Sequence, residues 1–184
     1  TFLKNKNEIL DLYGDKKDDV GSNYFIGSPI RAYYLLDFIG VWQENEASEA
    51  ARYGAKPGYP KYRDIYNKEG EEPNINLNDD RYIIGRDPSW IGSLNTSLAY
   101  KGFDFYVSLY TRQGVKALSE THKQSNDDPV RYRGFSANYW TPENQSNSHP
   151  APAIKGTYTE LGNSDYFVKD VSFVRISNIS LGYT

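Results

Sequence analysis

Residues 95–110, NTSLAYKGFDFYVSLY, alternate apolar and polar side chains on both sides of a two-residue turn. A period of two is that of a β-strand with one apolar face. Lys101 and Gly102 supply the turn, because glycine adopts the positive φ that a two-residue hairpin needs. The sequence therefore predicts an antiparallel hairpin with arms at residues 91–100 and 103–111.

Each arm of this hairpin has about ten residues, which is the length of a tilted transmembrane β-strand. It is also the length of a long hairpin in a soluble domain, where the apolar face would lie on a core. Alternation alone does not decide whether the apolar face contacts lipid or a protein core. The apolar face would carry Leu94, Thr96, Leu98 and Tyr100 from the first arm, and Phe103, Phe105, Val107 and Leu109 from the second.

A third strand is predicted in VSFVRISNISLGYT (171–184), where Ile179, Leu181 and Tyr183 alternate with polar residues. Val174 and Ile176 fall on the opposite, polar face, so we expect a bulge or a change of surroundings near Ser177. Weaker strand patterns cover residues 30–42 and 1–10. One short helix is predicted at 44–54, and long polar loops at 11–29, 43–89 and 111–166.

The composition excludes several classes of protein. The 21 basic residues are outnumbered by 24 acidic ones, and no basic run exceeds Lys16-Lys17, so a nucleic-acid partner is not expected. No apolar run approaches the roughly 20 residues of a membrane helix. There is no Cys, which excludes disulfides and thiolate sites, and no Met, so we expect the chain to be part of something longer. The 17 Tyr residues suit surfaces that are apolar on one side and wet on the other.

Six motifs in the same order as in a known family run along most of the chain. They are GSPIRAYYLLDFIGVWQ, KPGYPKYRDIYNKEG, DDRYIIGRDPSW, YKGFDFYVSL, YWTPENQ and SFVRISNISLGYT. Together they resemble the later, barrel-forming part of the SusC/RagA family of TonB-dependent outer-membrane transporters. The chain departs from the family at Gly58-Tyr59-Pro60, where Gly-Asp is usual before the Lys-Tyr motif, and its acidic loop is longer.

The resemblance implies an all-β fold: a segment of a transmembrane antiparallel β-barrel with long extracellular loops and one short loop helix. Residues 1–184 would form about five strands of a barrel that has about 22 in such transporters. The plug domain and the C-terminal strands would lie outside this segment. Lipid-facing side chains would be Leu94, Leu98, Tyr100, Phe105, Val107 and Leu109, with Tyr100 and Phe103 in the periplasmic aromatic girdle.

The implied function is nutrient import across the outer membrane of a Bacteroidetes-type bacterium, without enzyme chemistry. Glycans or oligopeptides would be taken up together with a SusD-like surface lipoprotein, and TonB would act through the plug. The alternative, from another class, is a soluble extracellular β-domain that binds carbohydrate through its tyrosines. A β-domain of a glycoside hydrolase ranks third, because the sequence does not show whether two carboxylates lie the required distance of about 5 to 10 Å apart. No nucleophile elbow or phosphate-binding loop is present either.

The acidic loop RDIYNKEGEEPNINLNDDR resembles a calcium loop of the family, with hard oxygen ligands of the kind that Ca²⁺ takes. The match is interrupted by the extra residue Tyr66 and the insertion EEPN, so a solvated acidic loop is the alternative. No other cofactor is expected. The predicted ligands are Asp64, Asn67, Glu69, Asp79 and Asp80.

The loop FSANYWTPEN gathers aromatic rings among small polar residues. Tyr139 and Trp140 are its candidates for contact with a ligand or with the SusD-like lipoprotein, which would form a lid on the barrel. The competing interpretation is packing within the loop. His122 and His149 have no acidic residue at a useful spacing, so neither is expected to be catalytic or to bind metal.

Overall fold

The computed structural model describes residues 1–67, 70–121, 137–153 and 156–184. They form two compact units. The first, here called the strand unit, comprises residues 1–33, 84–117 and 169–184; the second, the loop unit, comprises residues 34–83 and 118–168. In the described part of the chain, no helix is both long enough and apolar enough to cross a membrane.

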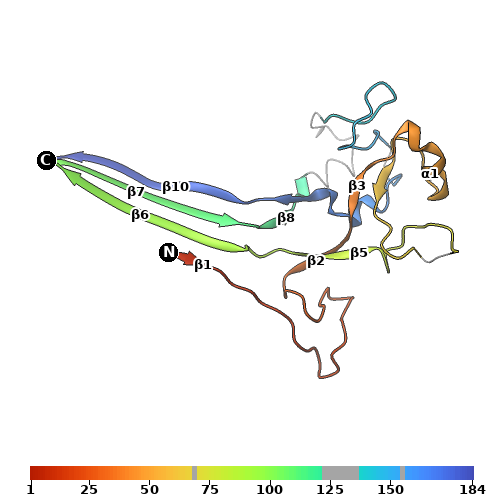
Figure 1. The fold of residues 1–184 in the computed structure, drawn as a ribbon, viewed down its shortest axis with the longest axis horizontal. Helices are drawn as coiled ribbons and strands as arrows, with labels where there is room; N and C mark the ends of the chain where they lie inside the picture. The colour runs from red at the N-terminus through yellow and green to blue at the C-terminus, as the bar shows by residue number, and fades with distance from the viewer. Residues whose placement is uncertain (68–69, 122–136, 154–155) are drawn as a thin grey trace. The chain divides into compact units, whose positions relative to one another are not determined.

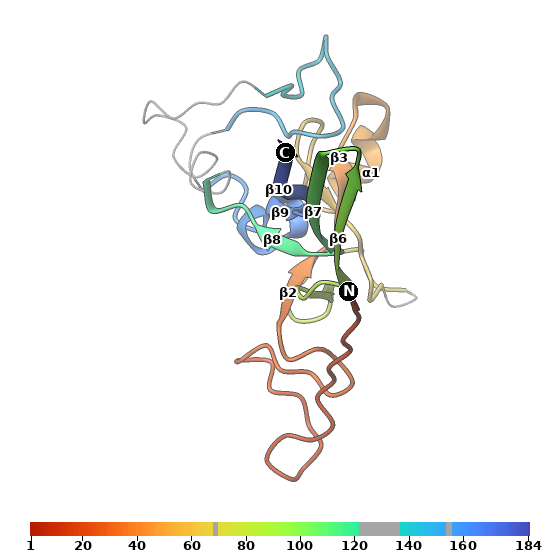
Figure 2. The ribbon, with the colours of Figure 1, turned by 90° about the vertical axis from the view of Figure 1, so that its left-hand side faces the viewer.

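The strand unit is built around a four-stranded antiparallel sheet in the order β1-β6-β7-β10 (Figure 1). Its short edge strand is β1 (Phe2–Leu3), and the other three have 11 residues each: β6 (Trp90–Tyr100), β7 (Phe103–Gln113) and β10 (Phe173–Tyr183). Figure 2 shows the three long strands side by side from their tip. The predicted hairpin and the predicted third strand are confirmed.

The turn between β6 and β7 has the backbone that the sequence predicts. Lys101 and Gly102 have φ values of 46° and 84°, both in the left-handed region. A two-residue turn with two positive φ values matches the twist of the strands that it joins. A Cβ atom at Gly102 would lie 2.7 Å from the carbonyl oxygen of Thr184, so glycine is also required for space.

The loop unit holds the helix that the sequence predicts within residues 44–54. A 3₁₀ turn, η1 (Glu44–Glu46), leads into α1 (Ala47–Arg52). Gln43 and Glu46 form a capping box at the start of η1. Beside them, β3 (Phe38–Val41) pairs with β4 (Pro60–Tyr62), while η2 (Leu161–Asn163) and η3 (Asp165–Phe167) follow later in the chain. The core of this unit includes Leu36, Val41, Trp42, Ala50, Leu161 and Phe167, all buried.

Two further strand pairs complete the fold: β2 (Ala32–Leu36) with β5 (Arg81–Gly85), and β8 (Lys116–Leu118) with β9 (Val168–Asp170). These correct the sequence reading, which predicted one strand over 30–42 and loops over 43–89 and 111–166. The first is broken at Asp37, whose carboxylate pairs with Arg63 and whose carbonyl accepts from the Arg63 amide. The predicted strand at 1–10 shrinks to Phe2–Leu3.

In the described residues the regular structure is mostly β-strand, and α1 is the short helix that the sequence predicts. The four-stranded sheet is open in this segment, with β1 and β10 at its edges. Open edges leave a row of unpaired backbone N–H and C=O groups, with which another strand can pair.

Candidate functional site

The sheet of the strand unit has one continuous apolar face. The register of β6 and β7 places Leu94 opposite Leu109, and Leu98 opposite Phe105. Directly opposite residues in an antiparallel pair point to the same side of the sheet. The predicted lipid-facing side chains therefore share one face, and Leu94 and Leu98 are 58% and 64% exposed.

A β-bulge brings β10 onto the same face. Ile176 pairs with Leu109 and Asn178 pairs with Ser108, so Ser177 is the extra residue. Because the bulge shifts the alternation by one residue, Val174 and Ile176 join Ile179, Leu181 and Tyr183 on the apolar face. The bulge that the broken pattern predicts is confirmed, and its effect is to keep one face apolar along the strand.

Aromatic rings gather at the turn end of the apolar face. The rings of Phe103 and Tyr183 lie 4.7 Å apart between centroids, and the ammonium of Lys101 lies 5.2 Å from the Tyr100 ring centroid. Rings of this kind prefer a boundary where one side is apolar and the other wet. The geometry agrees with the girdle predicted for Tyr100 and Phe103, whose membrane position stays a prediction.

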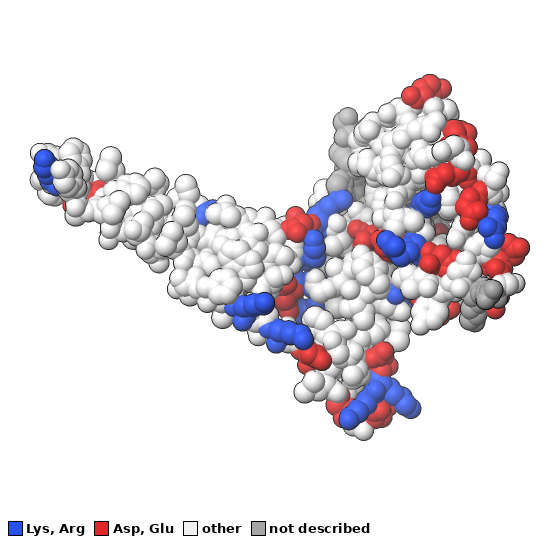
Figure 3. Space-filling model, viewed as in Figure 1, with Lys and Arg blue, Asp and Glu red and all other residues white. Residues whose placement is uncertain are grey.

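The opposite face of the sheet is polar. Ser108 Oγ donates a hydrogen bond of 2.6 Å to Asn95 Oδ1 across the hairpin, and the guanidinium of Arg175 stacks on Tyr110, 5.2 Å from its ring centroid. Asp104, Arg112 and Arg175 are the charged residues of the three long strands. Figure 3 shows few charged side chains along this sheet on the side that faces the viewer.

In the acidic loop, Asp80 organises the backbone. Its side chain is 2% exposed, and Oδ1 accepts from the amides of Ile65 at 2.8 Å and Tyr66 at 3.1 Å. Oδ2 accepts from the amide of Asn76 at 2.7 Å. Three amides on one carboxylate close the loop on itself, a role that the sequence did not distinguish from metal binding.

The other predicted calcium ligands are less closely gathered. Asp64 Oδ2 is buried without a hydrogen-bond partner among the described residues. Burial, and then the nearby Asp80 carboxylate, raise the pKa of Asp64. Asp79 accepts from the Asn76 side chain at 3.2 Å. Among the described residues no group of three or more acidic or His side chains could hold a metal ion; Glu69 lies outside them. The calcium site stays a prediction.

Trp140 has a packing role in the structure. Its side chain is 6% exposed, and Nε1 donates a hydrogen bond of 3.0 Å to Gln43 Oε1. Gly58, with φ +86°, packs so closely that a Cβ atom there would lie 2.7 Å from the indole. This supports the packing interpretation for Trp140, and lid or ligand contact by Tyr139 and Trp140 stays a prediction.

The two histidines are placed differently. His149 Nδ1 lies 2.9 Å from Ser148 Oγ, and its ring contacts those of Tyr139 and Tyr166 edge to face. His149 is thus held among aromatic side chains of the loop unit. His122 and Phe135 lie outside the described residues.

The loop unit also contains a cavity of about 290 Å³ that sequence reading missed. Its walls combine the residue after β3, the residues that follow α1, strand β4 and the segment before η2. The residues that give it its character are Trp42, Tyr53, Tyr59, Tyr62, Tyr158 and Glu160. They were not found because they are scattered between positions 42 and 160, and no spacing rule connects them.

The chain is similar to part of a known receptor. No protein-family model matches it. TonB-dependent receptor P3 of Formosa agariphila is 27% identical over 198 residues, an alignment that covers 99% of this chain and 19% of that protein. The chain thus spans about a fifth of the length of this curated relative.

Solved structures agree on the fold. A structure of the RagAB peptide transporter matches with a TM-score of 0.71 at 15% identity, over 99% of this chain and 20% of that one. The RagAB peptide importer in its open-open state matches with a TM-score of 0.65 at 14% identity, over 99% and 19%. Over almost its full length the chain is therefore similar to a segment of a TonB-dependent receptor and has the fold of a segment of the RagAB transporter, which confirms the resemblance that its motifs predict.

Proposed function

We propose that the strand unit forms part of the wall of an outer-membrane β-barrel, and that the complete protein is a TonB-dependent importer. The observation that carries this proposal is the exposed apolar face shared by three 11-residue strands, with a polar face behind it. At about 3.3 Å per residue such strands can cross, when tilted, an apolar band of roughly 25 Å.

The soluble alternative explains this face less well. A soluble sheet would cover its apolar side with another layer, yet Leu98 and Leu181 remain 64% and 72% exposed in this segment. An apolar stripe of this length is stable in water only when something covers it. Lipid covers such a stripe in a barrel wall, and the polar face then lines a wet interior.

The substrate and partners are proposed from similarity. RagAB is described as a peptide transporter, and oligopeptides are therefore the first substrate class to test, with glycans as the second. A SusD-like lipoprotein would cover the barrel from outside, and TonB would supply energy through a plug domain. The protein would lie in the outer membrane, and the substrate would pass through without any bond being broken.

Growth and uptake experiments test this function. A strain that lacks the complete gene is grown on matched panels of oligopeptides and glycans, with the wild-type gene restored as the control. We expect one panel to support growth only when the gene is present, and uptake of its labelled members to require TonB. Equal growth of both strains on every substrate, or uptake that is independent of TonB, contradicts the proposal.

A further inference from the structure

The cavity of the loop unit is held in shape by its own backbone and rings. The amide of Trp42 donates to the carbonyl of Tyr59 at 2.9 Å, and Gly58 donates back to Trp42 at 2.8 Å. Tyr158 donates its hydroxyl to the Ala151 carbonyl at 2.9 Å, and its ring meets that of Tyr59 edge to face at 5.1 Å. The walls are therefore preorganised, which lowers the entropic cost of binding.

The described residues that line the cavity carry negative charge and no positive charge. Glu160 is the only charged residue among those that line it in the described part of the chain. Tyr62 also lines it, and its buried hydroxyl has no hydrogen-bond partner among the described residues. Burial, and then the Glu160 carboxylate, raise the pKa of Tyr62. The Tyr62 hydroxyl and the Glu160 carboxylate both line the cavity, and each can accept a hydrogen bond from a donor that enters.

Ring faces in this region already attract ammonium groups. Lys61 Nζ lies 4.2 Å from the centroid of the Trp42 ring, while Lys56 Nζ lies 5.2 Å from that of Tyr59. Neither lysine lines the cavity, and Lys61 is already paired with Glu46. Among its described residues, the lining combines aromatic rings with a carboxylate and no cation, which is an arrangement that binds organic cations.

We infer that this cavity binds the side-chain ammonium or guanidinium of a basic residue in a peptide substrate. The inference rests on the proposed function and deepens it by naming a substrate class. Aromatic rings would surround the alkyl stem, and the charged head would donate to Glu160 and to Tyr62 Oη. A cavity of about 290 Å³ has room for one such side chain. Tyr59 and Pro60, where the sequence departs from the family motif, both line it.

A neutral sugar ring is the competing occupant, because it also stacks on aromatic rings. It would leave the carboxylate of Glu160 without a cation, in a site whose described lining residues include no basic side chain to bind hydroxyl oxygens. The charge of the lining therefore favours a basic side chain over a neutral glycan.

The test uses the complete transporter purified with its partner lipoprotein. Calorimetry measures the binding of acetylated and amidated Ala-Lys-Ala, of the same peptide with norleucine in place of lysine, and of cellotriose. We expect the lysine peptide to bind about tenfold more tightly than the norleucine peptide. Glu160→Gln should remove this preference, while Tyr62→Phe should reduce it and leave the fold intact.

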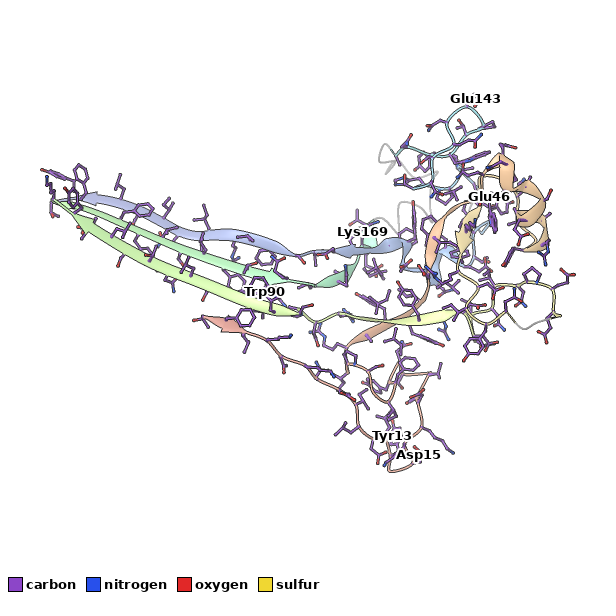
Figure 4. The ribbon with its side chains drawn as sticks, in the orientation of Figure 1. Tyr13, Asp15, Glu46, Trp90, Glu143 and Lys169 are labelled. Carbon is purple, nitrogen blue, oxygen red and sulfur yellow. The ribbon has the colours of Figure 1, made fainter. Side chains whose placement is uncertain are left out.

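Glu143→Gln is the matched control, because Glu143 is an exposed residue on a loop of the same unit (Figure 4). It should keep the full preference. Equal binding of the two peptides, binding of cellotriose alone, or a preference that survives Glu160→Gln overturns the inference. A Glu160→Gln variant that no longer holds the lipoprotein but still binds the lysine peptide normally also overturns the inference. Uptake by the wild-type strain is measured separately and tests the proposed transport function, whatever the binding results are.

Discussion

At the scale of single residues, Asp80 and Asp79 are neighbours with different roles. Asp80 is buried and accepts hydrogen bonds from three backbone amides, whereas Asp79 is exposed and accepts one from a side chain. The sequence predicted both as calcium ligands, because a run of acidic residues does not show which carboxylate turns inward. That choice depends on where the amides of Ile65 and Asn76 lie, which the fold decides.

Replacing Asp80 by Ala should open the acidic loop. An amide left without a partner in a buried position costs about 1 to 3 kcal/mol; these three are part-buried and partly hydrated once freed, so we expect a total loss of about 2 to 4 kcal/mol in the free energy of opening. Hydrogen exchange at the amides of Ile65, Tyr66 and Asn76, in calcium-free buffer, measures it. Asp79→Ala should change exchange by less than about 0.5 kcal/mol. Equal effects of the two variants would show that Asp80 does not hold the loop.

The predicted calcium site has its own measurement. Calcium titrated into the complete transporter should release binding heat and slow proteolysis within residues 64–80, since the ion would pair with the unpartnered Oδ2 of Asp64. Asp64→Asn should remove both effects, because an amide oxygen is a weaker ligand for Ca²⁺. Absence of heat together with unchanged proteolysis in the wild-type protein would leave a solvated acidic loop.

At the scale of elements, the long strands could be read from the sequence and the short ones could not. The period of two predicts arms at 91–100 and 103–111, within two residues of the bounds of β6 and β7, and their register follows from the turn at Lys101-Gly102. Strands such as β4 (Pro60–Tyr62) and β8 (Lys116–Leu118) are too short to show a period. Their pairing depends on partners that are distant in the sequence, so nothing local predicts it.

The bulge at Ser177 gives the sharpest prediction at this scale. Deleting Ser177 leaves a regular ladder in which Ile176 still pairs with Leu109 and Asn178 with Ser108, so Val174 and Ile176 stay on the apolar face. Removing the extra residue therefore moves no side chain to the other face. We expect the folded, heat-resistant fraction of the complete barrel to stay close to that of the wild type on gel electrophoresis without boiling.

Deletion of Ser180 is the comparison, because Ser180 pairs with Tyr106 on the regular part of the ladder. A one-residue slip there turns Leu181 and Tyr183, or else Ile179, toward the polar face, so the folded fraction should fall. A Ser177 deletion that assembles as poorly as the Ser180 deletion would mean that Ser177 is not a dispensable extra residue of the ladder.

At the scale of the whole molecule, the two faces of the strand unit differ in polarity and therefore favour different surroundings. Val107 lies opposite Thr96 and Ile179 on the apolar face, and Ser108 lies opposite Asn95 and Asn178 on the polar face. Stability alone cannot separate a barrel wall from a soluble sheet, because an arginine at Val107 would be harmful in lipid and in a core. Direct contact with lipid does separate them.

Single cysteines report that contact, and the chain has no Cys of its own to interfere. In the complete transporter in membranes, Val107→Cys should resist a water-soluble maleimide and, once labelled under denaturing conditions and refolded, its fluorophore should be quenched by a probe dissolved in the lipid. Ser108→Cys should escape lipid quenching, because its side chain faces the wet interior beside Asn95. Adjacent residues sit at nearly the same depth, so a difference between them reports the face alone. If the lipid probe reaches both positions equally, or fails to reach Val107, the hairpin does not span the membrane and the soluble alternative gains its first support.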